Sequence, residues 1–313
     1  MKRLFTVLAA AIMTAGVAFA QDVETFNQAV ETFNNGAMAL QNDNKTEALS
    51  MFKQALTIFE GCGEEGAEMV AKCKELIPST VISIAKDFIN DKEFDKALEC
   101  IDEAKKVAAE YGNEEAATEA AELVSTALNR KGASLVMAKD FANAIPVLQQ
   151  VVEAEPENGQ AFLLLGQSLL QIGKTDEAIA ALKTAAANGK DQANKLIGST
   201  YLKQGQAAVK AKKYAEAIEA IEEANKYIDN AQAYKLLAAA NSGSGKTAAA
   251  IVAYKKYLEL DPKAKDANKV MLTIAATAQK AGDKATAVEY YSKLQNDAEF
   301  GATAKAQLAA LKK

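Results

Sequence analysis

Histidine is absent from the 313-residue sequence. Without it, the chain cannot build a His-based zinc site, a Ser-His-Asp or Cys-His catalytic arrangement, or the usual general base for neutral pH. With only three cysteines and no histidine, a metal site is not expected either. This absence weighs against an enzyme more than any other feature of the composition, so we expect neither catalytic residues nor a metal or other cofactor.

Proline, arginine and long apolar runs are scarce as well. Four prolines among many Ala, Lys, Glu and Leu residues favour an all-α chain. Beyond residue 20 the only arginine is Arg130, and no stretch approaches the ~18 apolar residues that a spanning helix needs. The net charge of −5 is the opposite of what nucleic acid attracts.

Residues 1–20 have the features of a secretory signal peptide. Lys2 and Arg3 precede the apolar residues 4–17, and an Ala-x-Ala site ends at Ala20. No cysteine follows the site directly, which argues against a lipid anchor. The sequence therefore predicts an exported, most plausibly periplasmic protein that begins at Gln21 after cleavage.

The three cysteines are Cys62, Cys73 and Cys100. Export would expose them to oxidising conditions, so Cys62 and Cys73 could close a short loop. Nothing in the sequence fixes the distance between them, and this disulfide stays open. Cys100 lies within a predicted helix and is expected to pack as a small apolar residue.

Residues 159–192 carry the clearest pattern in the chain. Two helical stripes of apolar and small residues follow one another here: Phe162, Leu165, Gly166 and Leu169, then Ala178, Leu182 and Ala185. Glycine inside a helix costs roughly 1 kcal/mol against alanine. Gly166 is therefore expected where a second helix, carrying Ala178, comes too close for a β-carbon.

The same frame recurs in seven windows: 29–62, 78–111, 125–158, 159–192, 198–231, 231–264 and 268–301. The pattern resembles the tetratricopeptide repeat family. The resemblance implies an all-α, right-handed superhelical solenoid of about seven helix-turn-helix repeats. We expect a signal peptide over 1–20, the array over 21–301 and a C-terminal capping helix over 302–313. The intervening residues 64–76 and 112–124 are predicted to be helical too.

In this family the first helices line a concave surface that binds peptides, and the resemblance assigns inward positions here. None of them holds Asp or Glu, so the surface is apolar, rich in amides and weakly positive, although burial alone also depletes carboxylates. Such a surface suits an extended or acidic peptide. The candidate partner-binding residues are Phe33, Ile82, Lys86, Asn129, Met137, Leu163, Gln167, Gln206, Lys210 and Lys235.

Residues 240–247, ANSGSGKT, approximate a phosphate-binding loop in which Lys246 would reach the phosphates and Thr247 would hold magnesium. That motif requires a buried strand before it, whereas residues 233–240 are predicted to be helical. The preferred function is thus a non-enzymatic scaffold of the cell envelope that binds a protein or peptide. The alternatives are a nucleotide-binding enzyme using Lys246 and Thr247, and a structural component that self-associates.

Overall fold

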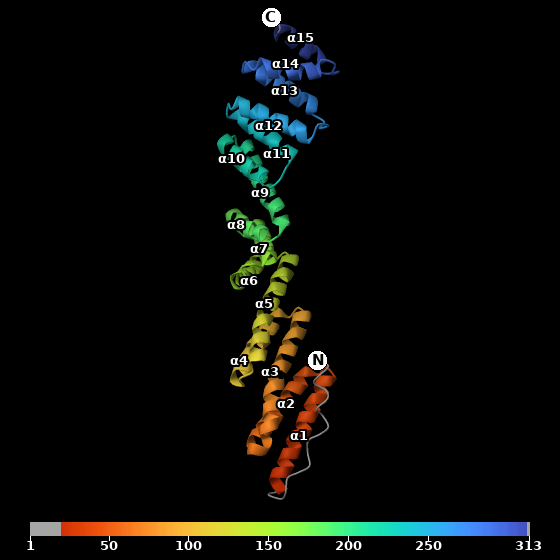
Figure 1. Ribbon diagram of the computed structural model, residues 1–313, viewed down its shortest axis with the longest axis vertical. Helices are drawn as coiled ribbons and strands as arrows, with labels where there is room; N and C mark the ends of the chain where they lie inside the picture. The colour runs from red at the N-terminus through yellow and green to blue at the C-terminus, as the bar shows by residue number, and fades with distance from the viewer. Residues whose placement is uncertain (1–19, 312–313) are drawn as a thin grey trace. The chain divides into compact units, whose positions relative to one another are not determined.

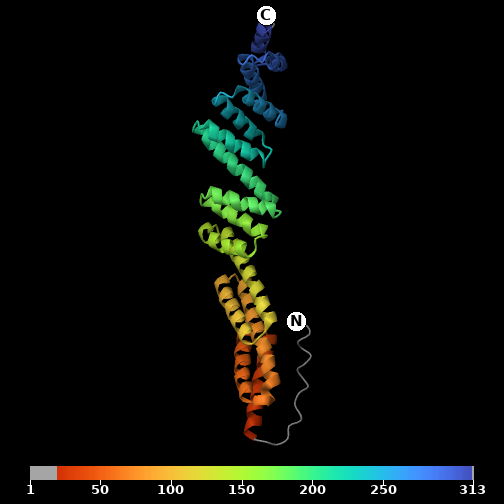
Figure 2. The same ribbon diagram turned by 60° about the vertical axis from the view of Figure 1, so that its left-hand side comes forward.

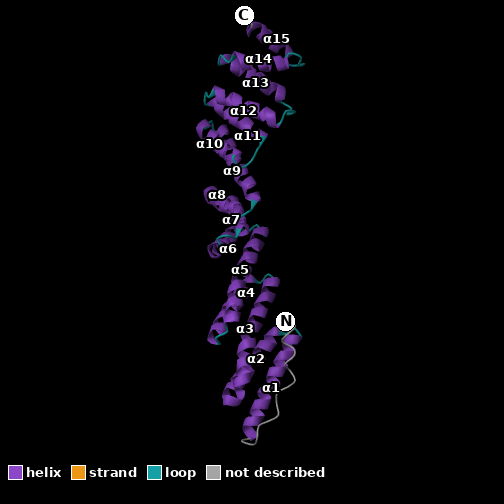
Figure 3. Cartoon of the chain, viewed as in Figure 1, coloured by secondary structure: helices purple, strands orange, loops and turns teal. Residues whose placement is uncertain are grey.

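Helices make up nearly all of the chain. The computed structural model describes residues 20–311, and every regular element within that range is a helix (Figure 3). Fifteen of these are α helices, and a short 3₁₀ helix, η2, spans Gly63–Gly66. The prediction of an all-α helical-repeat solenoid is confirmed, whereas the predicted signal peptide lies outside the described residues, apart from Ala20.

The described residues form two compact units, which meet between Ser134 and Leu135. Unit 1 comprises the described residues up to Ser134, and unit 2 those from Leu135 onward. The helices of unit 1 are α1 (Ala20–Gln41), α2 (Lys45–Gly61), α3 (Ala67–Asn90), α4 (Phe94–Glu110) and most of α5 (Glu114–Met137). In Figures 1 and 2, α1 to α4 are coloured from red to yellow, and each of α1, α2 and α3 packs on the next helix in the chain.

Unit 2 continues as shorter helices. They are α6 (Phe141–Ala154), α7 (Gly159–Gln171), α8 (Thr175–Ala187), α9 (Asp191–Lys210), α10 (Tyr214–Asn225), α11 (Ala231–Gly243), α12 (Thr247–Leu260), α13 (Ala267–Lys280), α14 (Lys284–Leu294) and α15 (Gly301–Leu311). Each of the helices from α6 to α14 packs on the next one in the chain. Equivalent helices of neighbouring pairs also meet, since α9 contacts α11.

Seven turns join the first and second helices of successive pairs. Each turn has one residue with positive φ, and these residues are Asp43, Lys92, Lys139, Gly173, Lys212, Gly245 and Gly282. In the pair predicted most clearly, the N–H of Gly173 donates to the Leu170 carbonyl at 3.3 Å and the N–H of Lys174 to that of Leu169 at 3.0 Å. These bonds satisfy carbonyls that the end of α7 leaves without helical partners. The recurring turn confirms about seven helix-turn-helix repeats.

Lys212 occupies a left-handed conformation that suits glycine better, with φ at 60°. This conformation costs a residue with a β-carbon about 1–2 kcal/mol. Glycine avoids that cost, but it loses more conformational entropy on folding, which offsets part of the gain. We therefore expect Lys212→Gly to raise the free energy of unfolding of unit 2 by about 0.5–1 kcal/mol. In urea titrations, Gly245→Ala at the equivalent turn should lower it by a similar amount. A destabilising Lys212→Gly would contradict this explanation of the turn.

Small residues allow the paired helices to approach closely, as predicted. A β-carbon on Gly166 would lie 2.6 Å from Cγ of Leu182 and 3.2 Å from the carbonyl oxygen of Ala178. Both Leu182 and Ala178 are fully buried. A β-carbon on Gly205 would similarly lie 2.4 Å from Cγ1 of Ile221 in the next pair. The glycines thus set how closely the two helices of these pairs pack.

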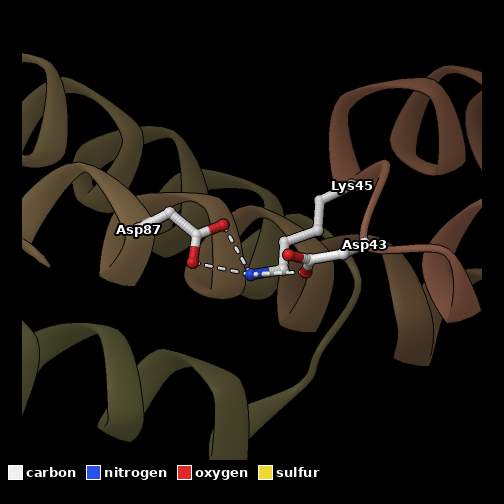
Figure 4. A network of polar contacts seen from close by, with 3 residues as sticks. All are labelled: Asp43, Lys45 and Asp87. Carbon is white, nitrogen blue, oxygen red and sulfur yellow. Dashed lines mark hydrogen bonds and ion pairs between the residues drawn. The ribbon is translucent and has the colours of Figure 1, made fainter. Parts of the chain in front are cut away.

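Unit 1 has longer helices, and ion pairs join them. Lys45, at the start of α2, has its ammonium nitrogen 2.6 Å from Oδ1 of Asp87 on α3 and 3.3 Å from Asp43 (Figure 4). Lys131 on α5 similarly pairs with Asp95 on α4 at 2.5 Å. The predicted helical segments 64–76 and 112–124 become the beginnings of α3 and α5, so these helices extend the regular first helices of their pairs.

Candidate functional site

Three of the ten candidate partner-binding residues are buried in the hydrophobic core. Phe33 of α1, Ile82 of α3 and Leu163 of α7 have 8%, 2% and 4% of their surface exposed. The Phe33 ring packs against Phe52 of α2, with ring centroids 5.3 Å apart. These side chains hold neighbouring helices together and have almost no surface to offer a partner. Their assignment as contact residues stays a prediction, and their burial does not support it.

The other two candidates in unit 1 are engaged within the chain. The ammonium group of Lys86 on α3 lies 2.5 Å from a carboxylate oxygen of Glu119 on α5, and both side chains are about half exposed. The side-chain amide of Asn129 on α5 is half-buried and donates to the carbonyl of Ser125 at 3.0 Å. The charge of Lys86 is thus balanced by a neighbour, so this lysine attracts an acidic partner less than its sequence position suggests.

Four of the candidates in unit 2 are more accessible. Met137, at the end of α5, is 83% exposed and has the most exposed large apolar side chain among the described residues. Gln206 and Lys210 of α9 are exposed, and Gln167 of α7 is half-buried. All four belong to first helices. The predicted site residues that remain available to a partner are thus concentrated in unit 2.

Lys235 of α11 belongs to a small polar cluster. Its ammonium group pairs with Asp266 and lies 5.4 Å from the ring centroid of Tyr257 on α12. The Tyr257 hydroxyl donates to Oδ1 of Asp266 at 2.6 Å. The hydrogen bonds from Lys235 and Tyr257 lower the pKa of the Asp266 carboxyl. Burial and the bond to Asp266 raise the pKa of Tyr257 to about 12. The ion pair of Lys235 with Asp266 therefore joins α11 to the start of α13, and the Lys235 side chain is only half-exposed.

Charge is segregated between the first and second helices of unit 2. The first helices α7, α9, α11 and α13 contain six lysines and a single carboxylate, Asp191. The second helices α6, α8, α10, α12 and α14 contain five lysines and nine carboxylates. In α7, α9, α11 and α13 the lack of acid thus extends beyond the predicted inward positions. In the rest of the article, the first helices α7, α9, α11 and α13 are called the first-helix set.

Two family models match unit 2. Both are described as tetratricopeptide repeat, and they cover residues 135–197 and 202–265. Residues 135–197 and 202–265 are thus tetratricopeptide repeats. Outside the matched residues, α1 to α4 and α13 to α14 repeat the same pairing of helices.

Several solved structures are similar to the chain. A structure described as MamA protein is 25% identical over 57% of this chain and 94% of its own, with a TM-score of 0.34. MamA from Desulfovibrio magneticus RS-1 is 19% identical over 55% of this chain and 93% of its own, with a TM-score of 0.32. YrrB, described as a TPR protein with an unusual peptide-binding site, is 15% identical over 57% and 91%, with a TM-score of 0.32. No curated protein matches the chain.

The phosphate-binding motif at residues 240–247 does not have the strand that it requires. The helix α11 extends to Gly243, and the tetratricopeptide turn follows at once, with Gly245 at a φ of 77°. Lys246 is the exposed N-cap of α12. Because the loop joins two helices of one repeat, the geometry of a nucleotide-binding enzyme using Lys246 and Thr247 is absent from this segment.

The described residues contain no group of three or more Cys, Asp or Glu side chains that could hold a metal ion, so the cysteines of unit 1 are not part of one. Cys62 and Cys73 do not form a disulfide. Burial, together with the nearby Glu60, raises the pKa of the Cys73 thiol to about 12, so this thiol is protonated at neutral pH. Cys100 is half-buried and packs against the core, as predicted.

Within residues 20–311, no helix has both the length and the apolar character needed to cross a membrane.

Proposed function

We propose that this tetratricopeptide repeat protein is a non-enzymatic scaffold that binds an acidic, extended segment of a partner protein along the first-helix set of unit 2. The observation that carries this proposal is the segregation of charge. The first-helix set contains six lysines and one carboxylate, in a chain with a net charge of −5. Amides complement the lysines, because an extended backbone needs hydrogen-bond partners. Gln167 and Gln206 can supply them.

The lysines act mainly by attracting the partner. Exposed charges of one sign speed the encounter with a partner of opposite sign, and salt weakens this effect. Lys203 and Lys210 lie two turns apart on α9 and are both exposed, whereas Lys235 is already paired with Asp266. Substitution of Lys203 and Lys210 therefore tests the set without disturbing an ion pair of the fold.

The double variant Lys203→Glu/Lys210→Glu should bind an acidic peptide about tenfold more weakly than the wild-type protein at low salt. The probe is a fluorescein-labelled peptide of alternating glutamate and valine, and fluorescence anisotropy measures its binding. Lys183 of α8 and Lys284 of α14 are exposed lysines of second helices, so Lys183→Glu/Lys284→Glu is the matched control. It makes the same change in net charge and should keep the affinity within about twofold.

If the two double variants weakened binding of the acidic peptide equally, the loss would follow from the change in net charge. The first-helix set would then not be the binding surface. Tighter binding of a lysine-valine peptide than of the acidic peptide would contradict the proposed partner chemistry. The ellipticity of all variants should match that of the wild type, since the four lysines are exposed. A loss of helicity would point instead to a structural role.

We further infer that the scaffold acts after export, in the periplasm. This proposal rests on residues 1–20, where Lys2, Arg3 and an apolar stretch precede the cleavage site at Ala20. Mass spectrometry of the native protein from fractionated cells tests it. The proposal expects a chain that begins at Gln21 in the periplasmic fraction, and a cytoplasmic chain that retains residues 1–20 would contradict it.

A further inference from the structure

A pocket opens in unit 1 where two helices end. It has a volume of about 260 Å³ and is open to solvent. Its lining comes from the last turns of α2, from α3 and from the end of α4. The lining residues are Lys53, Leu56, Thr57, Glu60, Lys74, Glu110 and Tyr111. None of them belongs to the first-helix set of unit 2, so the proposed scaffold function does not account for this pocket.

The electrostatics of the pocket favour a cation. The helix α2 ends at Gly61 and α4 ends at Glu110, and the C-terminal end of a helix carries a partial negative charge. Two ion pairs already neutralise the two lysines of the lining. Lys53 lies 2.8 Å from Glu103, and Lys74 lies 3.0 Å from Glu60. Among the described residues no ion pair engages Glu110, which leaves one lining carboxylate open to a cation.

Tyr111 and Leu56 give the pocket an apolar part. The ammonium nitrogen of Lys74 lies 5.6 Å from the centroid of the Tyr111 ring, so one cation already rests against this ring. Burial, and then the charges of Glu110 and Glu60, raise the pKa of the Tyr111 hydroxyl, which keeps the phenol neutral at pH 7. Leu56 is 6% exposed beside it. An aliphatic chain can therefore lie on the half-buried Tyr111 ring while a charged head reaches Glu110.

We propose that this pocket binds an organic cation with an aliphatic stem, that is, an alkylguanidinium or an alkylammonium group. The head would lie against Glu110, and the stem against the Tyr111 ring. A planar guanidinium suits this arrangement well, because it stacks on aromatic rings and bonds carboxylates through two N–H groups. The group can come from a basic side chain of a partner or from a free diamine. Its charge is opposite to that of the segment proposed for unit 2.

The test uses the full chain and compares a charged probe with a neutral probe of similar shape. In heteronuclear NMR titrations, n-butylguanidinium should shift the amide signals of Leu56, Glu110 and Tyr111 in a saturable manner. The neutral n-butylurea, of similar shape, should shift them far less. Glu110→Gln should weaken binding of n-butylguanidinium by about two- to fivefold. Glu122→Gln, which alters an exposed carboxylate of α5 in the same unit, should leave the affinity unchanged.

Equal shifts with n-butylurea would overturn the proposal, because the pocket would then recognise only the stem. Equal loss with Glu110→Gln and Glu122→Gln would overturn it too, because the cation would then be drawn by the overall charge. The comparison of probes needs only the wild-type protein and so does not depend on the folding of a variant. A capped arginine peptide that binds while 1,4-diaminobutane does not identifies a partner's side chain as the source. Binding of 1,4-diaminobutane without binding of the capped arginine peptide identifies a free diamine as the source. If neither probe binds, the proposal is refuted.

Discussion

Replacement of Phe52 by alanine should lower the free energy of unfolding of unit 1 by about 3–5 kcal/mol, because it opens a cavity in a closed core. Phe52 of α2 has no exposed surface, and its ring packs against that of Phe33. A β-carbon on Gly36 of α1 would lie only 3.0 Å from this ring, so the two helices meet on it. Urea titration followed by circular dichroism measures the loss.

Met38 provides the control for this prediction. It lies on α1, close in sequence to Gly36, but its side chain is 57% exposed. Met38→Ala should therefore change the free energy of unfolding by less than about 0.5 kcal/mol. If Phe52→Ala cost no more than Met38→Ala, the contact between α1 and α2 could not be what holds the first pair together.

Gly166→Ala should destabilise unit 2 by about 1–3 kcal/mol, even though alanine is the better helix former. Helix propensity alone predicts a gain of about 1 kcal/mol, so the sign of the change separates the two effects. The added methyl group would lie 2.6 Å from Cγ of Leu182, close to the backbone of α8, where the neighbour cannot simply rotate away. Denaturant unfolding of the purified variant measures the change.

Two further variants isolate the steric cause. Gly61, the last residue of α2, has open space where its β-carbon would lie, so Gly61→Ala should be neutral or mildly stabilising. In a double-mutant cycle, Leu182→Ala should remove most of the penalty of Gly166→Ala, because the clashing atoms are gone. Additive effects in that cycle would show that Leu182 is not the obstacle.

The helix pairs could be predicted from the sequence because their signals are local. The spacing of Gly166, Ala178 and Leu182 within one repeat predicted the close approach of α7 and α8. Gly173 predicted the turn between these two helices. At the other turns the signal was weaker. Lys92, Lys139 and Lys212 adopt the left-handed conformation without the glycine that usually marks it. Those turns were found only from the apolar pattern of the helices on either side.

The candidate site was harder to predict because it depends on contacts between distant residues. The family position that assigned Phe33, Ile82 and Leu163 to the binding surface does not show how much of each side chain its neighbours cover. The pair of Lys45 and Asp87 joins residues 42 apart, and the pair of Lys86 and Glu119 joins residues 33 apart. No spacing rule for a single helix connects such residues. The contrast in charge between first and second helices became visible once the helix bounds were known.

Hydrogen exchange of the purified chain, with and without the acidic glutamate-valine peptide, tests the binding surface most directly. The account predicts that the peptide slows amide exchange in α7, α9, α11 and α13, with little change in α8, α10 and α12. Protection confined to the second helices, or spread evenly over both sets, would contradict the claim that this tetratricopeptide repeat protein binds its partner along the first helices of unit 2.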